Sequence, residues 1–304
     1  MSASETASVA RAARNGDPAT RPLAWRVLAK GAGWAVTDVV CRAGPGDPSF
    51  EERHSAMCIA AVTQGTFEYR SSLGAAVFAP GSLLLGNKGL CFECGHDHGT
   101  GDRCLSFQYE PAYLERILAA VPGVRRLEFT VPRLPPVPAI MGLLAAAEAA
   151  RDDDDGAALE ELALELAAAV AAAQAESVPA KTAPSRRDVA RVSRALRLIE
   201  EAAEETLSLA DLARAAAMSP YHFLRTFREV AGVTPHQYVL RTRLHRAAVK
   251  LRRTDEPVST VAFGAGFNDL STFNRRFRRV MGVSPSAFRA GRVTRDQATG
   301  TRPI

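Results

Sequence analysis

The chain lacks long apolar runs, a secretory signal and an even set of cysteines. No run of about 18 apolar residues occurs in its 304 residues, so it offers no transmembrane helix. Residues 1–20 contain no apolar core of a signal peptide, and we expect a disordered tail there. Five cysteines predict reduced thiols rather than a disulfide framework. These absences predict a cytoplasmic protein with no membrane partner, and its length leaves room for two domains.

Lysine is nearly missing from the second part of the chain, which is nonetheless strongly basic. Residues 1–180 carry 15 Lys and Arg against 22 Asp and Glu, a net charge of −7. Residues 181–304 carry 23 against 11, a net charge of +12, and Lys181 and Lys250 are the only lysines among them. Arginine suits bidentate contacts to phosphate and guanine, so this half indicates a nucleic-acid partner. The competing interpretation is a solvated basic face without a ligand.

One segment of the basic half occurs twice. The pattern Phe-x-Arg-x-Phe-Arg-x-Val-x-Gly-Val-Thr/Ser-Pro spans residues 223–235 and again 273–285. Each copy follows a residue suited to an N-cap and reaches a glycine suited to the position just after a helix. A shorter apolar helix is expected before each copy, over Ser208–Ala217 and Val258–Gly264. A short helix, a tight turn and an arginine-bearing helix are typical of a helix-turn-helix, here in tandem.

Residues 21–110 have the pattern of a β-rich domain. Short apolar or alternating segments are separated by clusters of Gly, Pro and Asp. The predicted strands are Trp34–Val40, Met57–Val62, Thr66–Tyr69, Ala75–Phe78, Ser82–Leu85 and Leu105–Tyr109. Many short strands at near-even spacing predict a small barrel or a sandwich.

Residues 111–175 change to a helical pattern. Helices are expected over Tyr113–Ala120 and Pro138–Ala150. An alanine-rich helix follows, with an apolar stripe at helical spacing: Leu159, Leu162, Leu166 and Val170. Such a stripe forms either part of the core or a seam with a second copy, and we expect a helical dimerisation segment. The polar stretch 176–185 is predicted to be a linker, residues 186–290 a basic helical domain and residues 291–304 a tail.

Residues 186–290 resemble the DNA-binding domain of AraC/XylS-type transcription regulators. The resemblance is carried by LADLA at 209–213, Ser219-Pro220, Gly266-Phe267 and the turn 282–285. It implies seven helices, with the helix Pro235–Arg252 bridging the two helix-turn-helix units.

The N-terminal part resembles the cupin-like effector domain of the same family. His54, Gly65 and the segment Pro80–Leu85 carry this second resemblance. The predicted fold is therefore α+β with two domains. An N-terminal β-rich, cupin-like barrel would carry the helical dimerisation segment, and the C-terminal domain would be an all-α tandem helix-turn-helix domain.

The family resemblance implies that the second helix of each unit lies in the major groove of DNA. The paired phenylalanines of each copy stand four residues apart and must face the core, so the residues between them point elsewhere. The residues predicted to read bases are Tyr221, His222, Leu224 and Arg225, then Leu270, Ser271, Asn274 and Arg275. The residues predicted to contact phosphates are Arg228, Arg276, Arg278 and Arg279. For each of these four, the alternative is a surface arginine without a partner.

A thiol and histidine cluster is the second informative segment. It comprises Cys91, Cys94, His96, His98 and Cys104. A C-x₂-C pair followed by H-x-H supplies soft sulfur and imidazole donors, which suit Zn²⁺ or another thiophilic ion. We expect a turn at Gly95 to bring the two cysteines alongside the histidines. Three alternatives remain open: a redox-sensing cysteine pair, small core cysteines, and solvent-exposed hairpin histidines.

These patterns favour a dimeric, one-component transcription regulator rather than an enzyme. Its expected partners are double-stranded DNA, a second copy of the chain, and RNA polymerase. The alternative is a zinc-cysteine methyl-acceptor DNA-repair protein fused to an AraC-like domain. Such a protein needs about four clustered cysteines, whereas this cluster holds three. A cupin-type enzyme would need a metal triad, for which His54 alone is available in the expected place.

Overall fold

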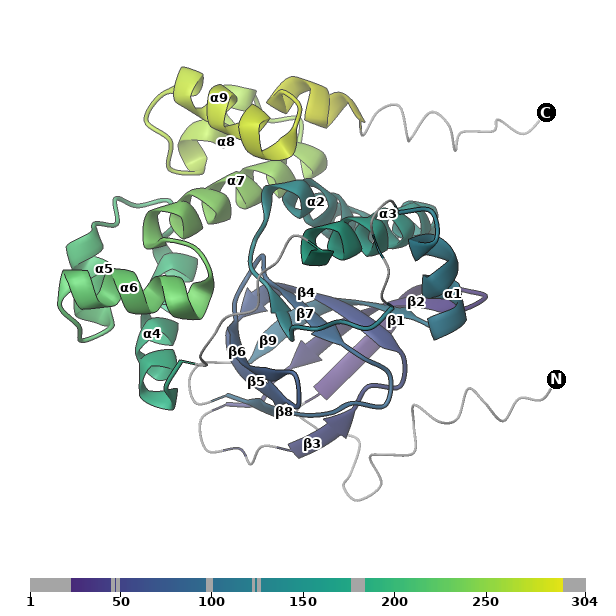
Figure 1. Cartoon of the computed structure of the whole chain (residues 1–304). Coiled ribbons are helices and arrows are strands. Elements are labelled where there is room, and N and C mark those ends of the chain that lie inside the picture. The colour runs from purple at the N-terminus through teal and green to yellow at the C-terminus, as the bar shows by residue number, and fades with distance from the viewer. Residues whose placement is uncertain are drawn as a thin grey trace, which may run out of the picture.

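The structure is a computed structural model that describes residues 23–44, 47, 50–96, 101–121, 124, 127–175 and 184–291. The predicted tail at 1–20, most of the predicted linker and the residues after 291 lie outside these ranges. Within them the chain folds as an N-terminal α+β region followed by a helical region (Figure 1). None of the helices in the described part combines the length and the apolar character needed to cross a lipid bilayer.

Two antiparallel sheets form the N-terminal region. The larger has the strand order β1 (Leu23–Gly31), β2 (Trp34–Cys41), β9 (Asp102–Tyr109), β4 (Met57–Gly65), β7 (Leu83–Gly86) and β10 (Arg133–Leu134). The smaller has the order β3 (Phe50–Arg53), β8 (Cys91–Gly95), β5 (Phe67–Ser71) and β6 (Gly74–Phe78). All six predicted strands coincide with observed ones. The sheets face each other as separate layers, and their pairing does not close into a barrel within the described residues.

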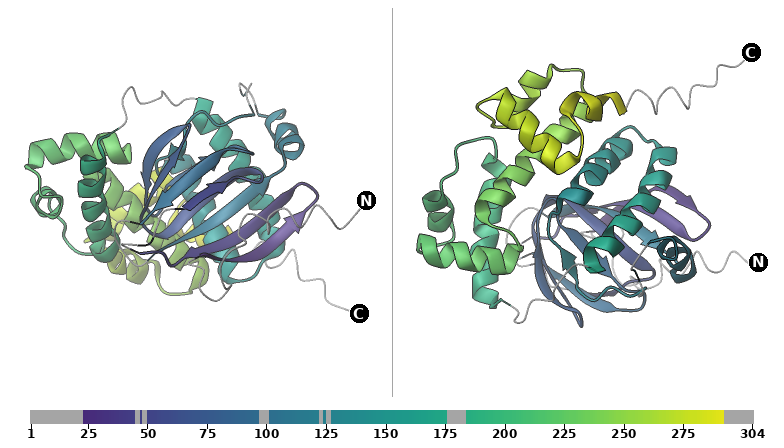
Figure 2. Two further views of the ribbon diagram at one scale, coloured as in Figure 1. Left: turned by 90° about the horizontal axis from the view of Figure 1, so that it is seen from below. Right: turned by 45° about the horizontal axis from the view of Figure 1, so that its top comes forward.

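Strand β4 shows how the sequence builds three layers. Alternate side chains of a strand point to opposite faces, and β4 is apolar on both. Ile59 and Ala61 belong to the core under the helices, whereas Cys58 and Ala60 belong to the core between the two sheets. The larger sheet is therefore the middle layer, with helices over one face and the smaller sheet over the other (Figures 1 and 2).

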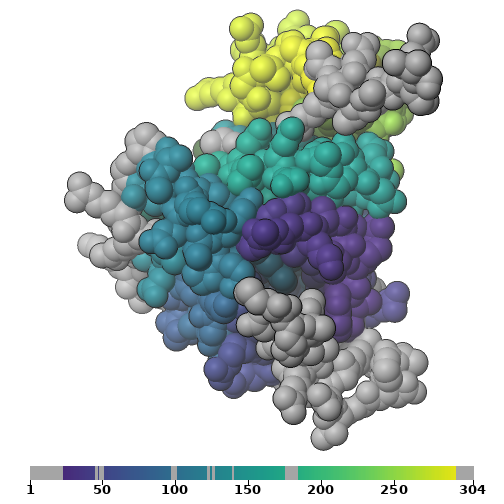
Figure 3. All heavy atoms as spheres, turned by 90° about the vertical axis from the view of Figure 1, so that its right-hand side faces the viewer, coloured from purple at the N-terminus to yellow at the C-terminus, as the bar shows by residue number. Residues whose placement is uncertain are grey.

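Helices α1 (Pro111–Leu118), α2 (Pro138–Asp152) and α3 (Gly156–Ala175) form the outer helical layer. The predicted stripe lies on α3 and is buried within this same chain, against the larger sheet and α2: Leu159, Leu162, Leu166 and Val170. The stripe therefore serves core packing and leaves no apolar seam for a second copy. Figure 3 shows α3 in teal beside β1 in purple, with the C-terminal helices in yellow above them.

The helical region contains α4 (Arg186–Ala202), α5 (Leu209–Ala215), α6 (Pro220–Ala231), α7 (Pro235–Arg253), α8 (Val258–Gly264), α9 (Leu270–Met281) and a last helical segment at 285–291. These are the seven helices that the resemblance implied. The first unit, α5–α6, and the second unit, α8–α9, lie at the two ends of α7 (Figure 1).

The two regions pack closely on each other. Val77 and Ala79, at the end of β6, belong to the core of the first unit. Met141 and Ala145 of α2 belong to the core of the second unit. Tyr238 Oη donates to the carbonyl of Pro80 at 3.0 Å across the same boundary. Each helix-turn-helix unit thus shares its core with a different element of the N-terminal region.

Candidate functional site

The two arginine-bearing helices, α6 and α9, are each anchored by a pair of phenylalanines. Phe223 and Phe227 are fully buried with ring centroids 5.4 Å apart, and Phe273 and Phe277 repeat this at 5.3 Å. A helix has about 3.6 residues per turn, so burying these positions turns the two residues that follow Phe223 and Phe273 outward. The core therefore decides which side chains each helix presents to solvent.

Of the twelve residues predicted to contact DNA, His222 and Arg276 are half-buried. The other ten are exposed: Tyr221, Leu224, Arg225, Arg228, Leu270, Ser271, Asn274, Arg275, Arg278 and Arg279. A side chain has to be accessible in this way before it can reach a base edge or a phosphate.

The second unit presents the more basic helix. Arg225 of α6 pairs with Glu229 at 3.8 Å, both side chains being well exposed. Helix α9 contains no Asp or Glu, and three of its four arginines line a hollow of about 600 Å³ with Asn274 and residues 284–286. The exposed arginines of α9 thus concentrate positive charge beside an opening of the surface, which favours an anionic ligand.

The start of α9 is capped more firmly than the start of α6. The Asp269 carboxylate accepts a hydrogen bond from the backbone nitrogen of Thr272 at 2.7 Å. That bond holds the pKa of Asp269 below its usual value. Ser219 makes no such bond at the start of α6, where Pro220 occupies the first turn instead. Both helices end at a glycine in the left-handed region, Gly232 and Gly282.

Arg243 holds the two units together and was not singled out from the sequence for that role. Its guanidinium donates to the carbonyl oxygens of Ala203, Glu205 and Gly266 at 2.5, 2.7 and 2.7 Å. These carbonyls lie after α4 and after α8, so one side chain on α7 joins the ends of two distant segments. The excess of arginine on α7 was the available signal, but it does not distinguish a structural clamp from a phosphate contact.

The predicted thiol and histidine site is divided by β8. Residues 91–95 form a strand, so no turn occurs at Gly95. Cys91 and Cys94 are three residues apart and therefore point to opposite faces. Cys94 packs with Phe92 against the core between the sheets. The structure thus separates the C-x₂-C pair, while His98 lies outside the described residues.

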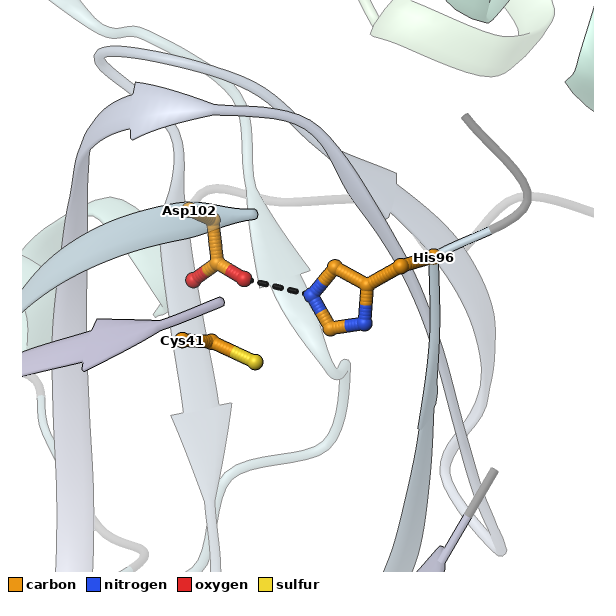
Figure 4. A group of neighbouring side chains, drawn as sticks. All are labelled: Cys41, His96 and Asp102. Atoms are coloured by element: carbon orange, nitrogen blue, oxygen red, sulfur yellow. Dashed lines mark hydrogen bonds and ion pairs between the residues drawn. The ribbon is translucent and has the colours of Figure 1, made fainter. Parts of the chain in front are cut away.

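A different set of donors meets at one end of the two sheets: Cys41, His96 and Asp102 (Figure 4). Cys41 ends β2 directly opposite Asp102, which begins β9, and His96 reaches across from the end of β8. His96 Nε2 lies 2.6 Å from Asp102 Oδ2, and both side chains are buried. One candidate donor atom from each of the three lies within 4.8 Å of the others. Of the five predicted ligands, His96 alone belongs to this set.

Electrostatics at this cluster favour the charged form of His96. Burial opposes the charge on His96, but hydrogen bonds to Asp102 and Cys41 outweigh burial and raise its pKa to about 10. Burial raises the pKa of Cys94 and of Cys104 well above their usual value. A raised pKa disfavours the thiolate, which is the form that reacts with oxidants.

His54 takes a structural place in the core between the sheets. Its ring stacks on Phe92 with centroids 4.3 Å apart, and Nε2 lies 3.0 Å from Tyr69 Oη. Burial lowers the pKa of His54 to about 4, so it is neutral at neutral pH. His54 is not in the group formed by Cys41, His96 and Asp102.

Comparison with known proteins locates the similarity in the helical region. A family described as a helix-turn-helix domain matches residues 212–291. The chain is 38% identical over 90 residues to the probable transcriptional regulator LumQ of Photobacterium leiognathi, and the match covers 30% of this chain and 36% of LumQ. It is 33% identical over 98 residues to the HTH-type transcriptional activator AarP of Providencia stuartii, covering 32% of this chain and 73% of AarP.

The regulatory protein ada of Salmonella typhimurium is also similar. It is 33% identical over 113 residues, which are 37% of this chain and 31% of ada. The chain thus spans about a third of the length of LumQ and of ada, but nearly three quarters of AarP.

Proposed function

This chain belongs to the AraC/XylS-type helix-turn-helix transcription regulators, and we propose that it binds a specific DNA sequence through α6 and α9. The observation that carries the proposal is the exposure of two arginine-bearing helices on buried phenylalanine pairs. An exposed helix of about 12 Å diameter fits the major groove of B-DNA. A net charge of +12 over residues 181–304 supplies attraction to phosphate.

Within each helix we assign the two kinds of contact by position. The first-turn residues and Arg225 or Arg275 would read bases, the two arginines by bidentate bonds to guanine. Leu224 and Leu270 would contact a thymine methyl group. Arg228 and Arg278 directly follow the second buried phenylalanine of each helix and would bind phosphates. With two such helices in one chain, a single copy would contact a bipartite half-site.

Selection of bound sites from random duplex DNA tests this assignment with the full chain. Arg275→Ala should relax the preference at one base position and leave the others unchanged. Arg116→Ala, an exposed arginine on α1, is the matched control and should select the parental sequence. If the Arg225→Ala and Arg275→Ala variants both select parental sites with parental affinity, α6 and α9 do not read DNA.

The N-terminal sheets would form the effector domain of the regulator. Their two facing layers share a buried aromatic and thiol core, which suits the cupin-like role expected from the sequence. We assign the regulator to the cytoplasm, where it would meet its DNA and contact RNA polymerase from the operator. Co-purification of the polymerase on operator DNA, with and without this chain, tests the second partner.

A homodimer would have to use another surface than the buried stripe of α3. Strand β1 is an edge strand, and it exposes Trp25 and Val27 to 49% and 52%. Exposed large apolar side chains on an open edge favour pairing with a second copy. Sedimentation should show a dimer for the parent and a monomer for Trp25→Arg. Leu166→Asp, on the buried stripe, should instead lower the stability of the fold.

The methyl-acceptor alternative receives less support. It requires about four cysteines at one metal, whereas the described donor group contains one, Cys41. The similarity to ada covers only 31% of that protein. We therefore expect no transfer of a methyl group from alkylated DNA to this chain, as measured with isotopically labelled substrate.

A further inference from the structure

We propose that Cys41, His96 and Asp102 bind a thiophilic transition ion of the Zn²⁺ type, and that its binding alters the contact between the sheets and the DNA-binding helices. The first half of this proposal concerns the N-terminal region alone. The second half rests on the proposed function, because it is read out as DNA affinity.

The donor set is the first reason for an ion. Sulfur, imidazole and carboxylate are the three donor types that hold zinc in proteins. Here they come from three separate segments: Cys41 and His96 are buried, and the Asp102 side chain is 8% exposed. These three residues would supply three of the four positions of a tetrahedral ion.

The backbone around the cluster is built for close approach. Gly65 and Gly101 both adopt positive φ, at 75° and 93°. A Cβ on Gly101 would lie 2.0 Å from the carbonyl oxygen of Cys41, and a Cβ on Gly65 would lie 2.2 Å from the carbonyl oxygen of Gly101. Only glycine allows these segments to press together. The strand ends that carry Cys41 and Asp102 are thus held in place before any ion arrives.

The cluster lies directly beside the joint between the two regions. Asp102 pairs in register with Gly65 on β4, and the backbone nitrogen of Gly65 donates to Glu200 Oε1 on α4 at 2.7 Å. The carbonyl of Glu200 in turn accepts a hydrogen bond from Arg246 on α7, the helix that bridges the two units. Asp102 is thus connected to α4 through its strand partner Gly65, and to α7 through Glu200.

A large cavity at the joint leaves room for this contact to change. It measures about 1270 Å³ and is lined from the sheet side by Cys41, Gly65 and Asp102, and from the helix side by Glu200 and Arg246. An ion bound to Cys41, His96 and Asp102 would fix the position of Asp102 and, through strand pairing, that of Gly65. The hydrogen bond from Gly65 to Glu200 would then carry this restraint to α4.

Titration of the full chain with Zn²⁺ against a chromophoric chelator tests the site. We expect one ion per chain and a loss of affinity of at least about tenfold in Cys41→Ser and Asp102→Asn, since even outer-shell partners of metal ligands have effects of that size. Cys91→Ser is the matched control, because Cys91 points away from the core, and its affinity should equal the parental value. Thermal unfolding of each metal-free variant checks that the fold is kept.

Co²⁺ in place of Zn²⁺ reports the sulfur ligands directly. The thiolate-to-cobalt absorption should weaken in Cys41→Ser and stay unchanged in Cys91→Ser. A parent that takes up neither ion would overturn the site. So would a Cys91→Ser variant that loses as much affinity and absorption as Cys41→Ser, because the metal would then belong to the C-x₂-C pair.

Operator affinity with and without Zn²⁺ tests the coupling. We expect a change of about fivefold or more in the parent, the lower end of common coupling between sites. Glu200→Ala, which removes the acceptor of the Gly65 hydrogen bond, should bind Zn²⁺ as the parent does and lose most of this change. An ion that binds with no effect on operator affinity would overturn the coupling and leave the site standing. A chain that selects no DNA would instead refute the proposed function, while the Zn²⁺ titration would still decide the site.

Discussion

The two helix-turn-helix units have separate cores of the same design and differ on their surfaces. Each is built on a fully buried phenylalanine pair and ends at a left-handed glycine. On the outside, α6 carries Arg225, Arg228 and the acidic Glu229, whereas α9 carries four arginines and no acid. Packing tolerates few side chains at a buried position, whereas the exposed positions are free to specify a ligand. The repeat therefore shows which residues fold each unit and which distinguish the two.

The surroundings of the units differ as well. The first shares its core with Val77 and Ala79 beside β6, and the second with Met141 and Ala145 of α2. Arg243 of α7 joins the end of α4 to the end of α8 by hydrogen bonds to their carbonyl oxygens. Two copies of one motif thus reach the N-terminal region through a strand and through a helix. Changes made at equivalent positions of the two units separate what the motif requires from what each location adds.

The largest effect is expected where the units are alike. Phe227→Ala and Phe277→Ala should each lower the free energy of unfolding by about 3–5 kcal/mol, because each removes a fully buried ring and leaves a cavity. Urea denaturation of the full chain measures both. Phe263→Ala, at a side chain 54% exposed, is the control and should change little. A mild effect at either buried position would mean that the two cores are not equivalent.

DNA affinity should separate the units. Arg275→Ala should weaken specific binding by about 1–3 kcal/mol through the loss of a base contact. Arg225→Ala should have a smaller effect, because Glu229 already competes for the Arg225 guanidinium. Fluorescence anisotropy on operator DNA measures both affinities.

Salt dependence gives the matching control. Arg278→Ala should lower the slope of log affinity against log salt by about 0.9, as expected for one lost phosphate contact. Arg275→Ala should leave that slope nearly unchanged. Equal slopes for Arg225→Ala, Arg275→Ala and Arg278→Ala would contradict the division into base and phosphate contacts.

The glycines that end α6 and α9 should differ although their φ angles agree. Alanine in the left-handed region costs about 1–2 kcal/mol, and this is the whole cost expected for Gly282→Ala, whose Cβ would enter open space. In Gly232→Ala the new Cβ would lie 3.1 Å from Pro135, so a further loss is expected. Thermal unfolding of the two variants provides the comparison. An equal loss of stability in both variants would show that Pro135 moves aside for the new Cβ.

The smallest effect concerns the helix starts. Asp269→Ala should lower the stability at neutral pH, because its carboxylate caps α9, whereas Ser219→Ala should not. The pKa of Asp269 is lowered in the folded state, so its contribution is present above the unfolded pKa and is lost as the pH falls through the folded one. Unfolding curves of the parent and Asp269→Ala should therefore converge in acid. The difference between the parent and Ser219→Ala should stay flat with pH.

The apolar periodicity of the sequence, with its helix caps and glycines, was enough to predict most elements of this fold. All six predicted strands and the helices of both units match the structure, because an apolar pattern with its caps and glycines is a local property of the chain. Strands β1, β3, β8 and β10 were not predicted. Strand β8 carries two cysteines and a glutamate among its five residues, so its sequence has little of the apolar alternation that marks a strand.

The sequence alone determined some features of this protein, whereas others depended on burial and on the pairing of distant strands in the tertiary structure. The sequence determined the tandem motif, its phenylalanine anchors and the outward arginines, since helical spacing alone turns them to opposite sides. Whether the α3 stripe packs within the chain or against a second copy depended on the sheet beneath it, which buries the stripe within the chain. The donor group depended on strand register: Cys41 lies 61 positions from Asp102 in the chain and directly opposite it in the sheet. Spacing along a sequence reveals neighbours on one helix or strand, but only the pairing of distant strands brings such residues together.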